Sequence, residues 1–131
     1  MSKILEYLKS NKPNNIIEKN VEIERFKNEK GEYMPFKIRS LTSSQYADAM
    51  AISGGSPTKL PTQIVIMGTV EPNLQDISLQ EAYGTVNAKE LAEKIFKPGE
   101  MFALSDEILR LSGFGGTFFP TKKELNEAKK H

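Results

Sequence analysis

The side chains that could do acid–base, nucleophilic or metal chemistry are poorly arranged for it in this 131-residue chain. The single histidine is His131, the last residue, and a chain end is rarely held rigidly enough to serve a nucleophile or to join other ligands. Asp106 and Glu107 are adjacent in a predicted helix, so their carboxylates point in different directions and cannot converge as an acid–base pair. The sequence therefore predicts no catalytic residue.

Metal and phosphate sites are equally unsupported. The chain has no cysteine, which excludes disulfides and thiolate metal sites. Two glycine-rich segments, residues 54–56 and 113–116, lack the Gly-Lys-Ser/Thr sequence that completes a phosphate-binding loop. We interpret the first as a linker and the second as a helix stop. We expect no cofactor, no metal and no enzymatic activity.

The distribution of charge excludes further classes of partner. The chain has 18 basic and 17 acidic residues, but residues 69–114 hold four basic and eight acidic ones, a net charge of −4, so the remainder carries +5. A segment this acidic repels phosphates, and we expect no nucleic-acid partner. No apolar run approaches the roughly 20 residues that span a bilayer, and the first residues are too polar for a signal peptide. We expect no membrane partner.

Residues 69–114 carry the clearest helical signals. A hydroxyl or amide three residues before a carboxylate is typical of a helix start, and glycine is typical of the position just beyond a helix end. The start signals are Ser78 with Glu81 and Asn87 with Glu90, and the end signals are Gly84 and Gly113. Together with apolar residues at helical spacing, they predict helices at about 78–83, 88–96 and 98–112.

The last of these helices has a narrow apolar seam with spacings of three, four and three residues. Its members are Met101, Leu104, Ile108 and Leu111. Packing in the protein's own core is the interpretation we favour, because amphipathic helices usually bury their stripe internally. The alternative gives part of the seam to a partner helix or a second copy, beside an exposed aromatic cluster. The candidate partner-binding residues are therefore Met101, Leu104, Ile108, Leu111, Phe114, Phe118 and Phe119.

The N-terminal half predicts strands as well as helices. Alternating residues on either side of a turn at residues 28–31 predict a β-hairpin at about 21–41, with one face covered by helices. Val21, Ile23 and Arg25 are assigned to one face of its first strand, and Phe26 to the other with the glutamates. Residues 2–10 predict an amphipathic helix too short to be stable alone, which must dock or fray.

Two further segments complete the N-terminal half. Thr42 or Ser43 caps a predicted helix at about 43–52, with Tyr46, Ala49 and Met50 facing inward. Residues 53–58 are interpreted as a mobile linker. Residues 62–68 are a strand on β-branched propensity, or a short buried helix capped by Thr62, and periodicity cannot decide between them.

Together these elements predict an α+β fold that is predominantly α-helical, with an N-terminal β-hairpin packed on a small bundle of short helices. Residues 1–114 are predicted to form a single globular domain. Residues 115–131 are predicted to form a partly flexible C-terminal tail with a short polar helix, capped by Thr121 and Glu124.

Four features of the chain, in this order, resemble one known family. They are the segments 23–26 with 36–42, 70–74 with 79–84, 91–100 ending in Pro-Gly-Glu, and 104–114 ending in Leu-Ser-Gly-Phe. The sequence resembles the tail assembly chaperones of contractile-tailed phages of Gram-positive bacteria, their prophages and phage-tail-like particles. The interruption by Gly54-Gly55-Ser56-Pro57 and Pro61 departs from the family's pattern, although the resemblance favours a helix at 62–68.

The resemblance implies a non-enzymatic function. Such a chaperone binds the tape measure protein and helps recruit tail tube subunits during tail morphogenesis. It is expected in the host bacterial cytoplasm and not in the mature tail. Exposed apolar residues also favour self-association as a homo-oligomer. The alternative is a small DNA-binding regulator, in which the helices at 78–83 and 88–96 around Gly84 form a helix-turn-helix-like pair, against which the negative charge argues.

Overall fold

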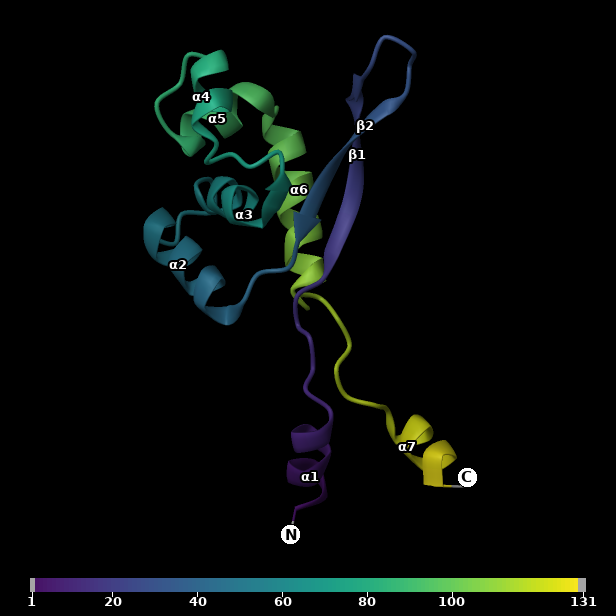
Figure 1. The fold of residues 1–131 in the computed structure, drawn as a ribbon. Helices are drawn as coiled ribbons and strands as arrows, with labels where there is room; N and C mark the ends of the chain where they lie inside the picture. Colours follow the sequence, from purple (N-terminus) through teal and green to yellow (C-terminus); the bar gives the residue numbers. More distant parts are fainter. Residues whose placement is uncertain (1, 130–131) are drawn as a thin grey trace.

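The computed structural model describes residues 2–129, so His131 lies outside the described residues. A body of sheet and helices carries a helix at either end of the chain, and both terminal helices extend from the same end of the body (Figure 1). The elements are α1 (Lys3–Ser10), β1 (Glu18–Lys27), β2 (Tyr33–Arg39), α2 (Ser43–Ser53), α3 (Leu60–Gly68), β3 (Thr69–Glu71), α4 (Ile77–Ala82), α5 (Ala88–Ile95), α6 (Pro98–Leu111) and α7 (Lys122–Lys129). The predicted α+β, mostly helical fold is confirmed.

The strands form one antiparallel sheet in the order β1-β2-β3. The predicted hairpin is confirmed, with Val21 opposite Phe36. The sequence did not predict β3, which pairs Thr69 with Ile38. A strand of three residues directly after a helix is too short to show a two-residue period, so no local pattern announces it.

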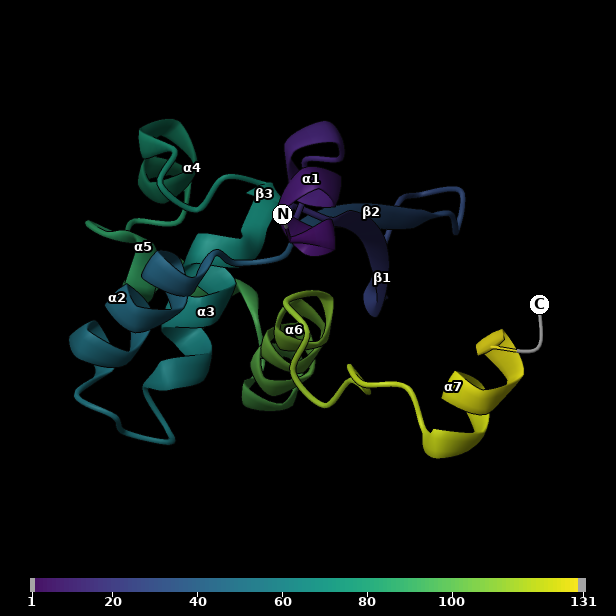
Figure 2. The same cartoon turned by 90° about the horizontal axis from the view of Figure 1, so that it is seen from below.

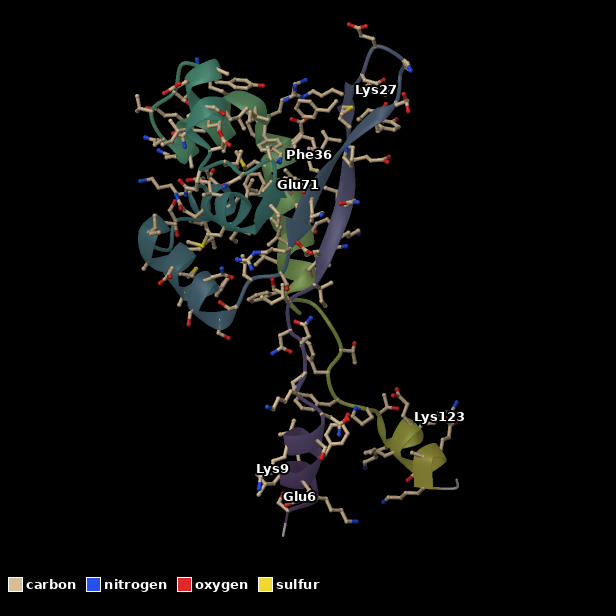
Figure 3. All side chains as sticks on the ribbon, in the orientation of Figure 1. Glu6, Lys9, Lys27, Phe36, Glu71 and Lys123 are labelled. Carbon is tan, nitrogen blue, oxygen red and sulfur yellow. The ribbon has the colours of Figure 1, made fainter. Side chains whose placement is uncertain are left out.

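One face of the sheet packs against α6 and contributes to a single core, with Phe36 lying between the sheet and the helices (Figure 3). Phe26 belongs to this face, so its assignment to the opposite face was wrong. Its ring lies 5.2 Å from that of Phe36 and 6.4 Å from that of Phe96. The physical reason is an irregular register between Glu22 and Lys27, which allows the neighbours Arg25 and Phe26 both to reach the helices.

The helix starts are partly as predicted. Asn87 caps α5 by accepting a hydrogen bond from the Glu90 N–H at 2.8 Å. The start assigned to Ser78 is wrong, because Asp76 caps α4 by accepting from the Leu79 N–H at 3.0 Å. The Ser78 hydroxyl donates to the same carboxylate at 2.6 Å, and this charged acceptor begins the helix earlier than the serine could.

The next two helices resolve the open questions of the N-terminal half. Thr42 caps α2 in a reciprocal pair with Gln45, as predicted. Ala49 is buried there, but Met50 is 36% exposed, so its inward assignment was wrong. Residues 62–68 are helical and belong to α3, yet Thr62 is not its cap, because the helix starts two residues earlier and Thr62 is buried within it.

α3 and α6 cross so closely that only glycine fits at the contact. A Cβ placed on Gly68 would lie 2.6 Å from Cδ1, 2.7 Å from Cγ2 and 2.9 Å from Cγ1 of Ile108. Ile108 is fully buried in α6. The close approach of backbone and side chain fixes where α6 lies against α3, and through α6 it positions the sheet.

The two terminal helices lie outside the core. All residues of α1 are exposed, so the helix is formed without docking on the body. The sequence had predicted that it would either dock or fray. The Ser2 hydroxyl caps its first turn and Asn11 its last, which satisfies groups that an uncapped helix leaves to water. α7 is the predicted short polar helix, capped by Thr121. Seen from below, α1 and α7 lie apart from each other (Figure 2). Within residues 2–129, no helix has the length and apolar character needed to cross a bilayer.

Candidate partner-binding surface

Three of the seven candidate residues lie inside the protein. Met101, Leu104 and Ile108 are buried members of the core that α6 shares with α3, α5 and the sheet. Leu111, one turn further on, is half-buried at the edge of this core. In this conformation the seam of α6 packs within the body, as the favoured interpretation expected.

The three phenylalanines beyond α6 are exposed. Phe114 packs on one side against Tyr46 of α2, with ring centroids 4.9 Å apart. Phe118 is 68% exposed and Phe119 is 84% exposed. The structure therefore separates the seven candidates into a buried group that builds α6 into the body and an exposed group at one end of it.

The turn at residues 113–116 holds Phe118 near the body. Gly113 and Gly115 have φ values of +99° and +78°, a conformation that favours glycine. A Cβ placed on Gly116 would lie 3.3 Å from Cε1 and Cζ of Phe118, so the ring lies over the turn. Leu109, Asp106 and Arg110 of α6 line a hollow beside it. We call Phe114, Phe118 and Phe119 together the phenylalanine surface.

A second apolar depression, which the sequence did not predict, lies between β1 and α6. Val21 and Ile23 of β1 and Ala103 and Leu104 of α6 line it, and we call it the β1–α6 groove. Its volume is about 210 Å³. Residues about 80 positions apart in the chain build it, and the only sequence signal was the alternation that placed Val21 and Ile23 on one face of β1.

Ion pairs between β1 and α6 lie at both ends of this groove. Lys19 contacts Glu107 at 3.0 Å at one end. At the other, Arg25 donates from Nε and Nη2 to the two carboxylate oxygens of Glu100, both at 2.8 Å. Arg25 also donates to the carbonyl oxygen of Ile95 and lies over the Phe26 ring. A two-pronged arginine–carboxylate pair of this kind fixes geometry as well as charge.

The Arg25–Glu100 pair predicts a pH-dependent part of the stability. Hydrogen bonds from Arg25 lower the pKa of Glu100 in the folded chain. A carboxyl group whose pKa is lower when folded stabilises the protein above its unfolded pKa, about 4.3 for glutamate, and that stability is lost as the pH falls through the folded pKa. We expect the wild type to lose more unfolding free energy than Arg25→Met when the pH falls below about 4.3.

Urea denaturation of the wild type and Arg25→Met over a pH series measures this prediction. Asp76 and Glu24 also have lowered pKa values, from hydrogen bonds with Ser78 and Tyr33 respectively, and their contribution is common to both chains. The difference between the two curves therefore reports the Arg25–Glu100 pair. A constant difference across the acidic range would contradict the prediction.

The charged groups of the described residues do not converge on a reaction centre. Asp106 pairs with Arg110 at 3.0 Å and Glu107 with Lys19, so these adjacent carboxylates diverge. Residues 2–129 contain no group of three or more histidine or acidic side chains placed to hold a metal ion. The outer face of α5, the helix that a DNA-binding pair would place in a groove, carries two basic and two acidic residues, Lys89, Glu90, Glu93 and Lys94.

Comparison with known proteins identifies a family. The model of a family described as phage XkdN-like tail assembly chaperone protein matches residues 56–129. This match runs from just before α3 through α7, so it includes the phenylalanine surface. The fold is similar to a crystal structure of the protein yqbn, with a TM-score of 0.66 and 22% identity over 78% of this chain and 89% of that chain. No curated protein matches the sequence.

Proposed function

Because this chain belongs to the phage XkdN-like tail assembly chaperone family, we propose that it binds the tape measure protein and helps recruit tail tube subunits while a tail assembles. A function in phage tail assembly follows from the family itself. The tape measure and tube proteins are the partners that the sequence resemblance implied. The exposure of Phe118 and Phe119 within the matched segment is the observation that supports this proposal most directly.

The phenylalanine surface suits an apolar partner. Two neighbouring aromatic side chains in water are costly to leave exposed, and exposed apolar clusters mark interaction sites in soluble proteins. Phe114 is held by Tyr46 and Phe118 by the glycine turn, so two of the three rings are already oriented. A partner helix that lays its apolar stripe across these rings would bury them without rearranging the body.

The surface is also suited to temporary binding. It lies at the edge of the body and adjoins a polar helix, so a tube subunit that competes for the same partner helix could displace it without unfolding the chaperone. We place this cycle in the host bacterial cytoplasm, with the chaperone absent from the mature tail. Binding and release supply all the work this function needs, so no reaction centre is required.

Replacing Phe119 with glutamate tests the proposal. Phe119 makes the smallest contribution to the body of the three rings, so the variant should fold normally while placing a charge inside the contact. We expect co-purification with the tape measure protein from the same phage or prophage to fall about ten-fold or more, as for an aromatic anchor of an interface. Affinity capture of co-expressed tape measure protein measures the loss, and circular dichroism checks the fold.

Val86→Glu is the matched control, because Val86 is 81% exposed and lies between α4 and α5, away from the phenylalanine surface. It introduces the same charge on an equally exposed apolar residue. Phe118→Glu should reduce binding as well, but it also removes the ring that covers the glycine turn. If Phe119→Glu and Phe118→Glu remain folded and both bind like Val86→Glu, the phenylalanine surface is not the interface.

A further inference from the structure

α1 is a formed helix whose apolar side has no partner within the described residues. Ile4 and Leu8 lie on one face, four residues apart, with Leu5 beside them, and all three are exposed. Lys3 and Lys9 flank this stripe on opposite sides. Lys3 lies four residues from Tyr7 at one edge of the stripe, and Lys9 lies four residues from Leu5 at the other edge. Glu6 lies on the opposite face, and α1 stands clear of the body (Figure 3).

The segment that joins α1 to β1 directs it away from its own body. The Ser40 hydroxyl accepts from the Ile17 N–H at 2.8 Å and donates to the Asn15 carbonyl at 3.0 Å, and Ser40 is almost completely buried. These bonds fix the chain up to Asn15. Lys12 is then biased toward an extended backbone by Pro13, so the few residues left are poorly suited to reverse direction and return α1 to its own sheet.

The α6 side of the β1–α6 groove matches α1 in length. Eight residues of helix measure about 12 Å, and the α6 segment from Glu100 to Glu107 that borders the groove rises about 10.5 Å. The groove is apolar along its floor, and three glutamates line it, of which Glu100 and Glu107 are already paired with Arg25 and Lys19. Glu22 is in none of the ion pairs formed by residues 2–129, and it remains available to a lysine from outside.

The first arm and the body have opposite net charges, whereas residues 115–131 carry +2. Residues 2–15 contain three lysines and one glutamate, a net charge of +2, whereas residues 16–114 contain 11 basic and 14 acidic residues, a net charge of −3. The first arm and the body therefore attract each other, yet the arm extends away from the body of its own chain (Figure 1). We propose that α1 of one chain docks in the β1–α6 groove of a second copy, with its apolar stripe on the groove floor and one of its lysines beside Glu22.

Two copies of the chain are complementary to each other, because each chain has both the helix and the groove. Reciprocal exchange between two copies gives a closed dimer, and one-way exchange gives a chain of copies. Docking buries three aliphatic side chains that are exposed in the single chain, and it gives a marginal helix the packing that stabilises short helices. The lysine–glutamate component makes the association weaker as salt is added.

Sedimentation velocity of the full chain over a range of protein concentrations tests this proposal. We expect the wild type to associate with increasing concentration, and Leu8→Asp to weaken the association about ten-fold or more, since it places a charge on the groove floor. Glu6→Gln, on the opposite face of α1, should associate like the wild type. A wild type that remains monomeric throughout, or a Leu8→Asp variant that associates like Glu6→Gln, overturns the proposal.

Cysteine cross-linking locates the contact and separates exchange from folding back. The chain has no cysteine, so a mixture of Leu8→Cys chains and Ala103→Cys chains can form the mixed disulfide only between two copies. We expect that disulfide under mild oxidation, and none when Glu6→Cys replaces Leu8→Cys. If the mixture does not cross-link, but one chain carrying both substitutions forms an internal disulfide, α1 returns to its own groove and the exchange proposal is wrong.

This inference does not depend on the tape measure partner. Phe119→Glu, which tests the proposed function, lies outside both α1 and the groove and should leave the sedimentation unchanged. Loss of partner capture with normal self-association, or the reverse, therefore identifies which of the two proposals has failed.

Discussion

Replacing Leu104 with glutamate is expected to unfold the body of this protein at neutral pH. Leu104 is 4% exposed in the core between α6 and the sheet. A glutamate there would lie on the same side of α6 as Glu100 and Glu107, four residues after one and three before the other, so it meets repulsion as well as burial. An uncompensated buried charge costs several kcal/mol, which is a large part of the roughly 5–15 kcal/mol typical of a domain's stability.

Ala103→Glu is the control that separates burial from charge. Ala103 is the exposed neighbour of Leu104 on α6, and it is likewise three or four residues from Glu100 and Glu107. We expect it to change the unfolding free energy by only about 0.5 kcal/mol. Near-UV circular dichroism and urea denaturation measure both variants. Cooperative unfolding of Leu104→Glu near the wild-type midpoint would show that α6 does not bury this residue.

Adding one methyl group at Gly68 is expected to destabilise the protein by about 1–3 kcal/mol, the usual cost of overpacking a core. Three carbon atoms of Ile108 lie within 2.9 Å of the place where the new Cβ must go, so the helices have to separate or Ile108 has to leave its rotamer. Urea denaturation of Gly68→Ala should show a lower midpoint with an unchanged dependence on urea concentration.

A double-mutant cycle with Ile108→Ala shows whether this contact is the cause. Ile108→Ala alone should cost about 2–5 kcal/mol because it leaves a cavity. It also removes all three of the atoms that the methyl group added at Gly68 would meet, so in the double variant this methyl group occupies part of the vacated space. The double variant should lose less unfolding free energy than the two single variants lose together. If the two losses simply add, the contact with Ile108 is not the cause of the effect at Gly68.

Gly99→Ala provides the matched glycine control. Gly99 is in the first turn of α6, where an added Cβ meets no atom within 4 Å. Alanine should be neutral or stabilising there by up to about 1 kcal/mol, because it reduces the freedom of the unfolded chain. If Gly68→Ala and Gly99→Ala lowered the free energy of unfolding by similar amounts, the cause would be alanine near a helix end in general rather than the close crossing of α3 and α6.

The helices could largely be predicted from the sequence because their signals are local. Asn87 and Thr42 cap their helices through neighbours three residues away, and Gly84 and Gly113 have the positive φ that their positions indicated. The error at α4 is also local, because Asp76 and Ser78 are both capping residue types two positions apart, and the carboxylate is the stronger acceptor. Residues 62–68 were ambiguous because α3 is buried on several sides and shows no single apolar stripe.

Contacts between residues far apart in the chain could not be predicted from the sequence. The alternation in β1 placed Arg25 on the same face as Val21 and Ile23 but gave no sign that it would bind Glu100, 75 positions later. The candidate surface shows the same division. The sequence identified Phe118 and Phe119 as an exposed apolar pair, whereas assigning Met101, Leu104 and Ile108 to the core or to a partner required the position of the sheet.

The attachment of the hairpin to α6 has a consequence for how the chain matures on the ribosome. Strands made early in synthesis find their covering helix only after residues 98–111 have emerged, and the Lys19–Glu107 and Arg25–Glu100 contacts close loops of 88 and 75 residues. Closing such long loops delays the packing of the hairpin on α6, so the apolar face of the nascent hairpin stays uncovered for most of translation. General chaperones that bind nascent chains would bind the exposed hairpin in that interval, before this protein can act in tail assembly itself.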